Sequence, residues 1–131
     1  MDAVPKIRTK NNFYGKIKAV SVDFTKYKSL ANGTECPDGM ALTVNARAGI
    51  FSMKYEINVV NPTNCTMFTY KGEYGNYAKM RFAGNGKKTI EAATDYLNAL
   101  NMAFPSEENK MLGMNLAEAM GTIAGAFGKS R

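Results

Sequence analysis

The chain has 131 residues, of which 45% are hydrophobic, so it is long and apolar enough for one globular domain and is not a disordered protein. It carries 17 basic and 11 acidic residues, a formal charge of +6, which favours an anionic partner, nucleic acid ahead of an anionic membrane surface. Histidine is absent, which removes the commonest general base and a common metal ligand. We therefore expect no enzyme, no metal and no cofactor.

The two cysteines, Cys36 and Cys65, are too few for a disulfide scaffold and lack the paired spacing of a zinc site. Free thiols in a reducing compartment are the simplest expectation, since thiols seldom pair there. Disulfides between subunits stay open. No internal repeat divides the chain, and we expect a single domain over residues 1–131.

Residues 1–28 form a basic arm that we expect to be a β-hairpin or strand. This segment contains seven lysines and arginines but only two acidic residues, Asp2 and Asp23. Aromatic residues are interleaved with the basic ones. Such a mixture suits nucleic acid, because cations neutralise phosphates and rings stack on unpaired bases. Lysines along an edge strand that guard against association of sheets are the competing interpretation. Lys16 and Lys18 fall on the same side of the predicted strand as Val20, which suggests either a β-bulge or a face buried by a partner.

Residues 39–83 alternate between apolar and polar side chains, the pattern of half-buried strands. We expect an antiparallel meander of four strands at 41–48, 51–60, 65–71 and 77–82, with Phe51 on the apolar face. The open face of such a sheet meets water or a ligand. Its expected polar and basic side chains are Thr43, Asn45, Arg47, Ser52, Lys54, Asn58, Lys79 and Arg81.

After the sheet, over residues 88–127, apolar residues recur at spacings of three and four, and this spacing predicts two helices. The first should run over 88–103 and end before Pro105. The second should run over 107–126, with Ser106 capping its free amides. Its large apolar stripe includes Leu116, Met120 and Ile123.

A second stripe of the same helix consists of small residues spaced four apart: Gly113, Ala117, Gly121 and Gly125. Each glycine inside a helix costs roughly 1 kcal/mol, so a compensating gain is expected. Close approach of another backbone, in the core or in a dimer, is the gain that we expect. A membrane-spanning helix is a poor alternative, because the segment is glycine-rich and holds Asn115 and Glu118.

The order of elements is therefore a basic hairpin, an antiparallel sheet and two closing helices, an α+β fold completed by dimerisation. In this order and in length the chain resembles the levivirus-like coat proteins of the small single-stranded RNA bacteriophages. Arg47, the strand 54–59 and the basic, aromatic strand 77–82 running into a helix are similar as well.

The resemblance implies a viral structural protein, a self-assembling capsid protein of the virion. Its subunits form homodimers by joining their sheets edge to edge, the helices lie across the partner, and the far sheet face binds genomic RNA. On that reading the open-face residues listed above, with Lys16 and Lys18, contact RNA. The small-residue stripe, with Leu116, Met120 and Ile123, packs the dimer, and no membrane is involved. A preference for RNA over DNA, a particular RNA hairpin, the shell geometry and the host stay open.

A non-assembling protein that binds single-stranded nucleic acid in the host cytoplasm is the alternative. It would use the same basic surface and would stack bases on Phe13, Tyr14, Tyr70, Tyr74 and Tyr77.

Overall fold

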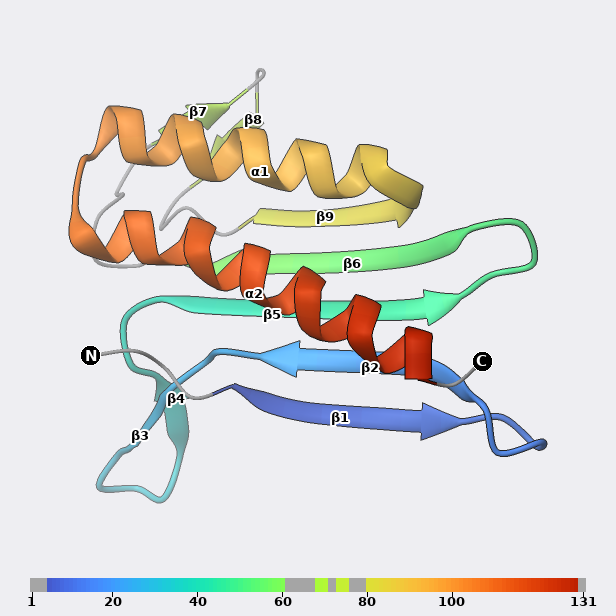
Figure 1. Ribbon diagram of the computed structural model, residues 1–131. Coiled ribbons are helices and arrows are strands. Elements are labelled where there is room, and N and C mark those ends of the chain that lie inside the picture. Colours follow the sequence, from blue (N-terminus) through green and yellow to red (C-terminus); the bar gives the residue numbers. More distant parts are fainter. Residues whose placement is uncertain (1–4, 61–67, 71–72, 76–79, 130–131) are drawn as a thin grey trace.

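Two helices lie side by side across one face of an antiparallel β-sheet, and no described helix or strand covers the opposite face (Figure 1). The computed structural model describes residues 5–60, 68–70, 73–75 and 80–129. This arrangement confirms the expected α+β class with C-terminal helices on one face.

The sheet contains five described strands in the order β1-β2-β5-β6-β9, and each neighbouring pair is antiparallel. The N-terminal hairpin is confirmed and becomes one edge of the sheet. The hairpin consists of β1 (Lys6–Asn11) and β2 (Ile17–Asp23). The other three strands of the sheet are β5 (Ala41–Ala48), β6 (Met53–Val60) and β9 (Met80–Asn85).

The expected four-stranded meander is wrong in its third strand. β7 (Phe68–Tyr70) pairs with β8 (Glu73–Gly75) in a separate two-stranded sheet, and β6 pairs directly with β9. Another small hairpin precedes β5 and consists of β3 (Tyr27–Ser29) and β4 (Glu35–Pro37).

Phe51 was expected on the apolar face of β6, but it is 99% exposed. The chain turns over residues 49–52, where the amide of Gly49 donates to the carbonyl oxygen of Ser52 at 2.9 Å. A side chain at Gly49 would collide with that same oxygen. The turn therefore places Ile50 and Phe51 beyond the end of the sheet.

The bulge expected near Lys18 is present. Lys10 pairs with Ala19, whereas the next residue, Asn11, pairs with Ile17, so Lys18 is the extra residue of β2. The shift lets Lys18 stay exposed although Val20, two residues on, is buried.

The helices are α1 (Gly86–Ala103) and α2 (Glu107–Lys129), close to their expected bounds. The hydroxyl of Ser106 accepts a hydrogen bond from the amide of Asn109 at 3.0 Å, which confirms the expected cap. Between them and the sheet lies one core, whose fully buried members include Val22, Leu42, Val44, Ile57, Val59, Tyr96 and Leu100.

The small-residue stripe of α2 was expected to pack closely against another backbone, either in the core or in a dimer. It does not pack in the core. Leu116 and Ile123 are buried and Met120 is partly buried, but Gly113, Ala117, Gly121 and Gly125 are exposed. A Cβ added at any of the three glycines would meet no other atom within 4 Å. Close packing in the core is therefore excluded for this stripe, and packing in a dimer stays a prediction.

Candidate nucleic-acid interface

The uncovered face of the sheet is formed by the residues that alternate with the core. On β5, Leu42, Val44 and Ala46 are buried under the helices, so Thr43, Asn45 and Arg47 point to the other side. Because the strands are in register, these positions continue across all five strands as three cross-strand rows.

The first row carries three cations and no carboxylate: Lys10, Ala19, Arg47, Lys54 and Asn85. Arg47 and Lys54 are directly opposite each other on neighbouring strands, where residues are about 4.5–5.5 Å apart. Two like charges at that spacing repel each other, and an anion between them would relieve the repulsion. This row is therefore the most electropositive line on the open face.

The other two rows mix charges of both signs. The second row is Arg8, Ser21, Asn45, Glu56 and Ala83, and the third is Lys6, Asp23, Thr43, Asn58 and Arg81. Over the three rows, six cations stand against two carboxylates. The face thus has a clear positive excess together with neutral hydrogen-bonding side chains.

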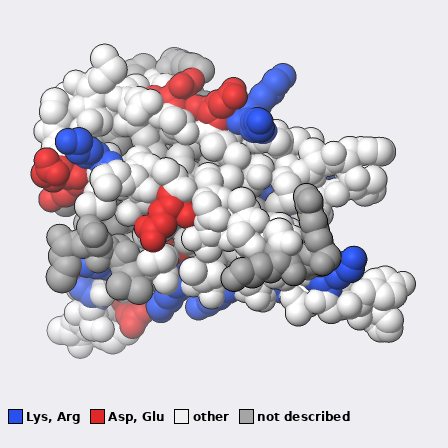
Figure 2. Space-filling view, viewed as in Figure 1, with Lys and Arg blue, Asp and Glu red and all other residues white. Residues whose placement is uncertain are grey.

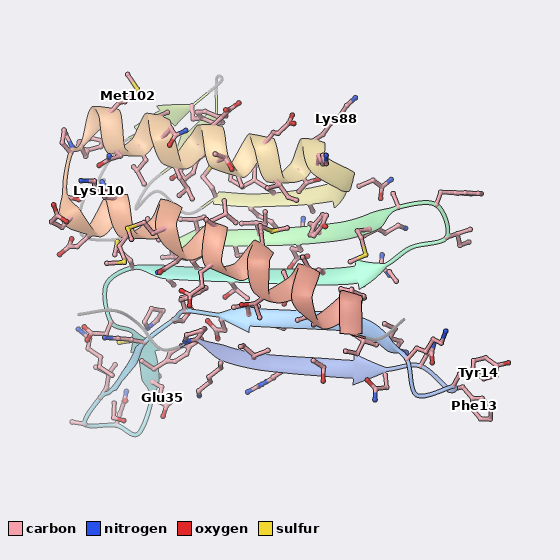
Figure 3. All side chains as sticks on the ribbon, in the orientation of Figure 1. Phe13, Tyr14, Glu35, Lys88, Met102 and Lys110 are labelled. Carbon is pink, nitrogen blue, oxygen red and sulfur yellow. The ribbon has the colours of Figure 1, made fainter. Side chains whose placement is uncertain are left out.

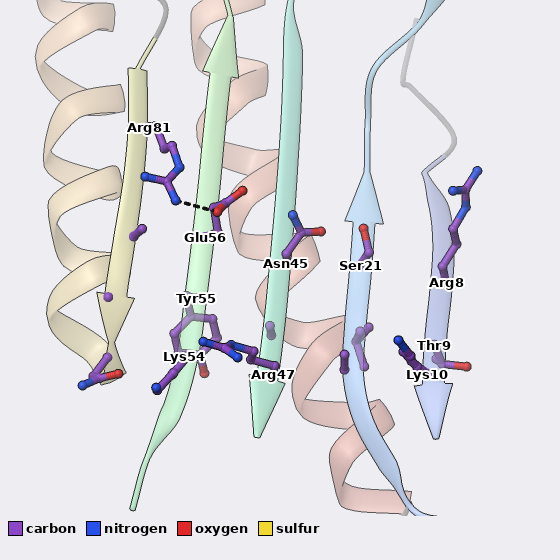
Figure 4. A pocket seen from close by; sticks show the side chains of 16 residues that line it. Arg8, Thr9, Lys10, Ser21, Asn45, Arg47, Lys54, Tyr55, Glu56 and Arg81 are labelled. Atoms are coloured by element: carbon purple, nitrogen blue, oxygen red, sulfur yellow. Dashed lines mark hydrogen bonds and ion pairs between the residues drawn. The ribbon is translucent and has the colours of Figure 1, made fainter. Parts of the chain in front are cut away.

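A shallow hollow of about 660 Å³ lies over this face (Figure 4). Arg8 and Lys10 come from β1, Ser21 from β2, and Asn45 and Arg47 from β5, so its lining draws on strands far apart in the chain. Eight of the ten side chains labelled in Figure 4 belong to the three rows; the other two, Thr9 and Tyr55, alternate with them, and Tyr55 packs against the core. An extended, flexible anion could therefore lie along the face and meet several cations at once.

One ion pair lies within the hollow, between Arg81 of β9 and Glu56 of β6, with 2.8 Å between Nη2 and Oε2. The Asn58 amide also donates to Glu56, at 3.2 Å. These hydrogen bonds lower the pKa of the Glu56 carboxyl, and the bond from Arg81 has the largest effect. Glu56 is therefore charged at neutral pH and offsets part of the positive field beside Arg81.

Most of the residues expected on the open face do lie there. Thr43, Asn45, Arg47, Lys54, Asn58 and Arg81 are all members of the three rows. Ser52 lies in the turn between β5 and β6, Lys16 lies in the turn between β1 and β2, and Lys18 is the bulged residue. Lys79 lies outside the described residues.

Sequence reasoning missed the contribution of β1. Lys6, Arg8 and Lys10 were counted only as part of a basic arm, yet all three lie on the open face beside β2. Their spacing of two was the available signal, since alternate residues of a strand share a face. Ser21 was missed for the same reason.

The structure describes four of the five expected base-stacking aromatics, and it packs one of them, Tyr70, against the core. Tyr70 packs edge-on against the core residue Tyr96, with 5.4 Å between ring centroids, and is partly buried. Phe13 and Tyr14 are exposed at a hairpin end, Tyr77 lies outside the described residues, and Tyr74 belongs to β8. The prediction that all five residues form one base-stacking surface is therefore wrong for Tyr70.

Within the described ranges, no three acidic or cysteine side chains come together as a metal site. Cys36 is a partly buried free thiol in β4, and Cys65 lies outside the described residues. Neither α1 nor α2 has the length and apolar character that crossing a membrane requires. Comparison with known proteins yields no match to a family model, a curated protein or a solved structure.

Proposed function

We propose that the protein is a self-assembling coat protein that dimerises and binds single-stranded RNA on the open face of its sheet. The observation that carries the proposal is the difference between the two sheet faces. One face is sealed by two helices, whereas the other is uncovered, basic and hollowed. A shell protein needs such an asymmetry, because one side contacts the packaged genome.

The edges of the sheet support dimerisation through β9. β1, at one edge, is exposed throughout and carries Lys6, Arg8 and Lys10, and charges of one sign discourage the pairing of two such edges. β9, at the other edge, carries Arg81 as its one charged residue. Two β9 strands paired about a two-fold axis would join two open faces into one larger basic surface.

The outer surface of α2 suits a separate contact between copies, because α2 lies over β2 and β5, whereas α1 lies over the β9 edge. Its exposed glycines leave open space that a partner helix could enter, and small residues allow two backbones to approach closely. The helix side of the molecule is also largely uncharged, with charged side chains scattered over it (Figure 2). A neutral, smooth surface of this kind is compatible with burial against a second copy.

RNA binding on the open face would be directed mainly at phosphates, because the charged residues that line the hollow are five lysines and arginines and one carboxylate, Glu56. Thr43, Asn45 and Asn58 would add neutral hydrogen bonds. Binding should weaken steeply with salt, since neutralised phosphates release their counterions.

The test is to express the untagged chain in bacteria and examine the product by light scattering, negative-stain microscopy and ultraviolet absorbance. We expect closed particles that contain nucleic acid. A species no larger than a dimer, free of nucleic acid, would rule out a self-assembling shell.

A variant pair tests the face itself. Lys54→Glu with Arg81→Glu should give folded protein that no longer packages RNA. Lys87→Glu with Lys88→Glu makes the same charge change at the start of α1, on residues that do not line the hollow, and should package normally. Equal RNA content in the two variants would show that the open face is not the binding surface.

The second candidate is a non-assembling protein that binds single-stranded nucleic acid. Phe13 and Tyr14 favour it, because they are 95% and 83% exposed and can stack on bases. Quenching of tyrosine fluorescence by short DNA, with no particles formed, would support it over the coat protein.

A further inference from the structure

The turn between β1 and β2 presents two aromatic side chains to solvent at one end of the sheet. Phe13 and Tyr14 pack edge to face, with 5.5 Å between ring centroids, and project beyond the strands (Figure 3). Exposed neighbouring aromatic rings are costly in water and often mark an interaction site. We call residues 12–16 the aromatic tip.

Hydrogen bonds hold the aromatic tip in shape. The side-chain oxygen of Asn12 accepts hydrogen bonds from the amides of Tyr14 and Lys16, at 2.9 and 3.0 Å. The Asn12 amide also donates to the carbonyl oxygen of Lys16 at 2.7 Å, and Gly15 supplies the positive φ of +79°. A tip ordered before binding loses little conformational entropy when it docks.

The charged residues that neighbour the aromatic tip along the chain are all positive. Lys10, Lys16 and Lys18 flank it, and no acidic residue occurs between residues 5 and 22. All three lysines are exposed. The tip therefore combines two exposed aromatic rings with neighbouring lysines. A complementary binding site would be an apolar pocket bordered by acidic residues.

At the other end of the molecule, β2 ends and α2 begins (Figure 1). A pocket of that kind is lined by residues from these two places. It measures about 380 Å³, and Phe24, Met40 and Met111 contribute to its apolar lining. Asp38 and Glu108 also line it, with Lys26 as the one cation. Methionine side chains adapt their shape and make favourable contacts with aromatic rings.

We infer that the aromatic tip of one copy docks into this pocket of another copy, with Phe13 and Tyr14 against the methionines. Lys16 and Lys18 then face Asp38 and Glu108. The inference rests on the proposed self-assembly and specifies a contact that joins the dimers to one another. The tip and the pocket lie on different parts of the surface, so the contact is heterologous and can propagate.

A second copy fits the two features better than a lipid surface does. An anionic membrane would account for the aromatic tip and its lysines, but it would leave the acidic, apolar pocket unexplained. Charge and apolar character are complementary between the two ends of this one chain. Each dimer would present two tips and two pockets, so it could bind several neighbours and build a surface instead of a chain.

Charge reversal in two separate variants tests the contact. One variant carries Lys16→Glu with Lys18→Glu, and the other carries Asp38→Lys with Glu108→Lys. Alone, each brings like charges together, and we expect each to remain a dimer by sedimentation of the RNA-free protein. Mixed in equal amounts, the two variants contain complementary tips and pockets, and we expect association beyond the dimer to return.

Removal of the rings tests the apolar half. Phe13→Ser with Tyr14→Ser should raise the concentration needed for association at least about tenfold, because buried aromatic anchors dominate interfaces. Ile50→Ser with Phe51→Ser removes the equally exposed apolar pair of the neighbouring turn, and Met102→Ser removes an exposed side chain elsewhere. Both controls should associate like the wild type. Circular dichroism checks that each variant is folded.

The contact is overturned if the mixed charge variants associate no better than either alone, or if the tip variant associates normally. These outcomes differ from failure of the proposed function. A wild-type chain that packages RNA but ignores these substitutions retains the function and loses the contact. A chain whose dimers associate through the tip without binding RNA retains the contact and loses the function.

Discussion

On β5, Leu42 and Val44 are fully buried beneath the helices, whereas Thr43 and Asn45, between or beside them, lie on the open face. The same strand thus supplies a core and a polar surface by simple alternation. Folding free energy comes mainly from the covered face, because apolar burial is its largest favourable contribution. The charges of the open face contribute little to folding, and the proposed binding of RNA would account for their presence.

Paired substitutions on β5 give the largest expected difference between the two faces. Leu42→Ala should lower the free energy of unfolding by about 2–5 kcal/mol, since it leaves a cavity in a filled core. Asn45→Ala, three residues away on the open face, should change it by no more than about 0.5 kcal/mol. Urea denaturation measures both. A loss at Asn45 as large as that at Leu42 would mean that the open face also stabilises the fold.

RNA binding should show the reverse pattern. A variant with Lys10→Gln, Arg47→Gln and Lys54→Gln lacks all three cations of the first cross-strand row. For single strands, each phosphate contact contributes about 0.7 to the slope of log affinity against log salt. The slope should therefore become shallower by about 2.

The matched control neutralises three exposed lysines of the helices, with Lys87→Gln, Lys88→Gln and Lys110→Gln. It has the same net charge as the first variant, so a difference between the two reports on location. Filter binding of labelled RNA at several salt concentrations gives both slopes. Identical slopes would show that RNA senses the overall charge and no particular face.

The outer surface of α2 offers a smaller effect that separates folding from association. Gly121→Ala and Gly125→Ala should each stabilise the single chain by about 0.5–1 kcal/mol, because alanine fits the free space and favours a helix. In a dimer packed on this stripe, the added methyl groups should instead weaken association. Gly128→Ala, near the end of the same helix, is the control.

Thermal unfolding at low concentration and sedimentation at high concentration measure the two effects. Stabilisation with unchanged association would remove this stripe from the dimer interface.

The helices and the N-terminal hairpin could be predicted because their patterns are local. Ile90, Ala93, Leu97 and Leu100 recur at helical spacing, and all four contact the core. The pairing of β6 with β9 could not be read in the same way. It joins segments separated by residues 61–79, and apolar alternation indicates a strand without naming its partner.

The candidate site was predicted in part for related reasons. Arg47 and Lys54 follow directly from alternation on two neighbouring strands. Arg8 and Lys10 join them because β1 pairs with β2 in a register set by the bulge at Lys18, a detail of tertiary structure. Phe51 was misplaced because apolar residues continue the alternation through the turn, where hydrogen bonding, and not polarity, ends the strand.

The smallest effect concerns Glu56, the carboxylate within the hollow of the open face. Hydrogen bonds from Arg81 and Asn58 lower its pKa, so ionised Glu56 stabilises the fold. This contribution is complete at neutral pH and is lost in acid, as the pH falls below the ordinary glutamate pKa of about 4.3 and through the lowered value. Both partners are largely exposed, so the pair should contribute only about 0.2–1 kcal/mol.

Glu56→Gln should therefore be slightly less stable than the wild type at pH 7, and the difference should disappear in acid. The same change removes a negative charge from the open face, so it should strengthen the proposed RNA binding at neutral pH. Opposite signs are expected because the carboxylate helps the fold and repels phosphate. Urea denaturation across pH and RNA titration measure the two quantities. Weaker RNA binding in this variant would mean that Glu56 contacts RNA directly or positions Arg81 for it.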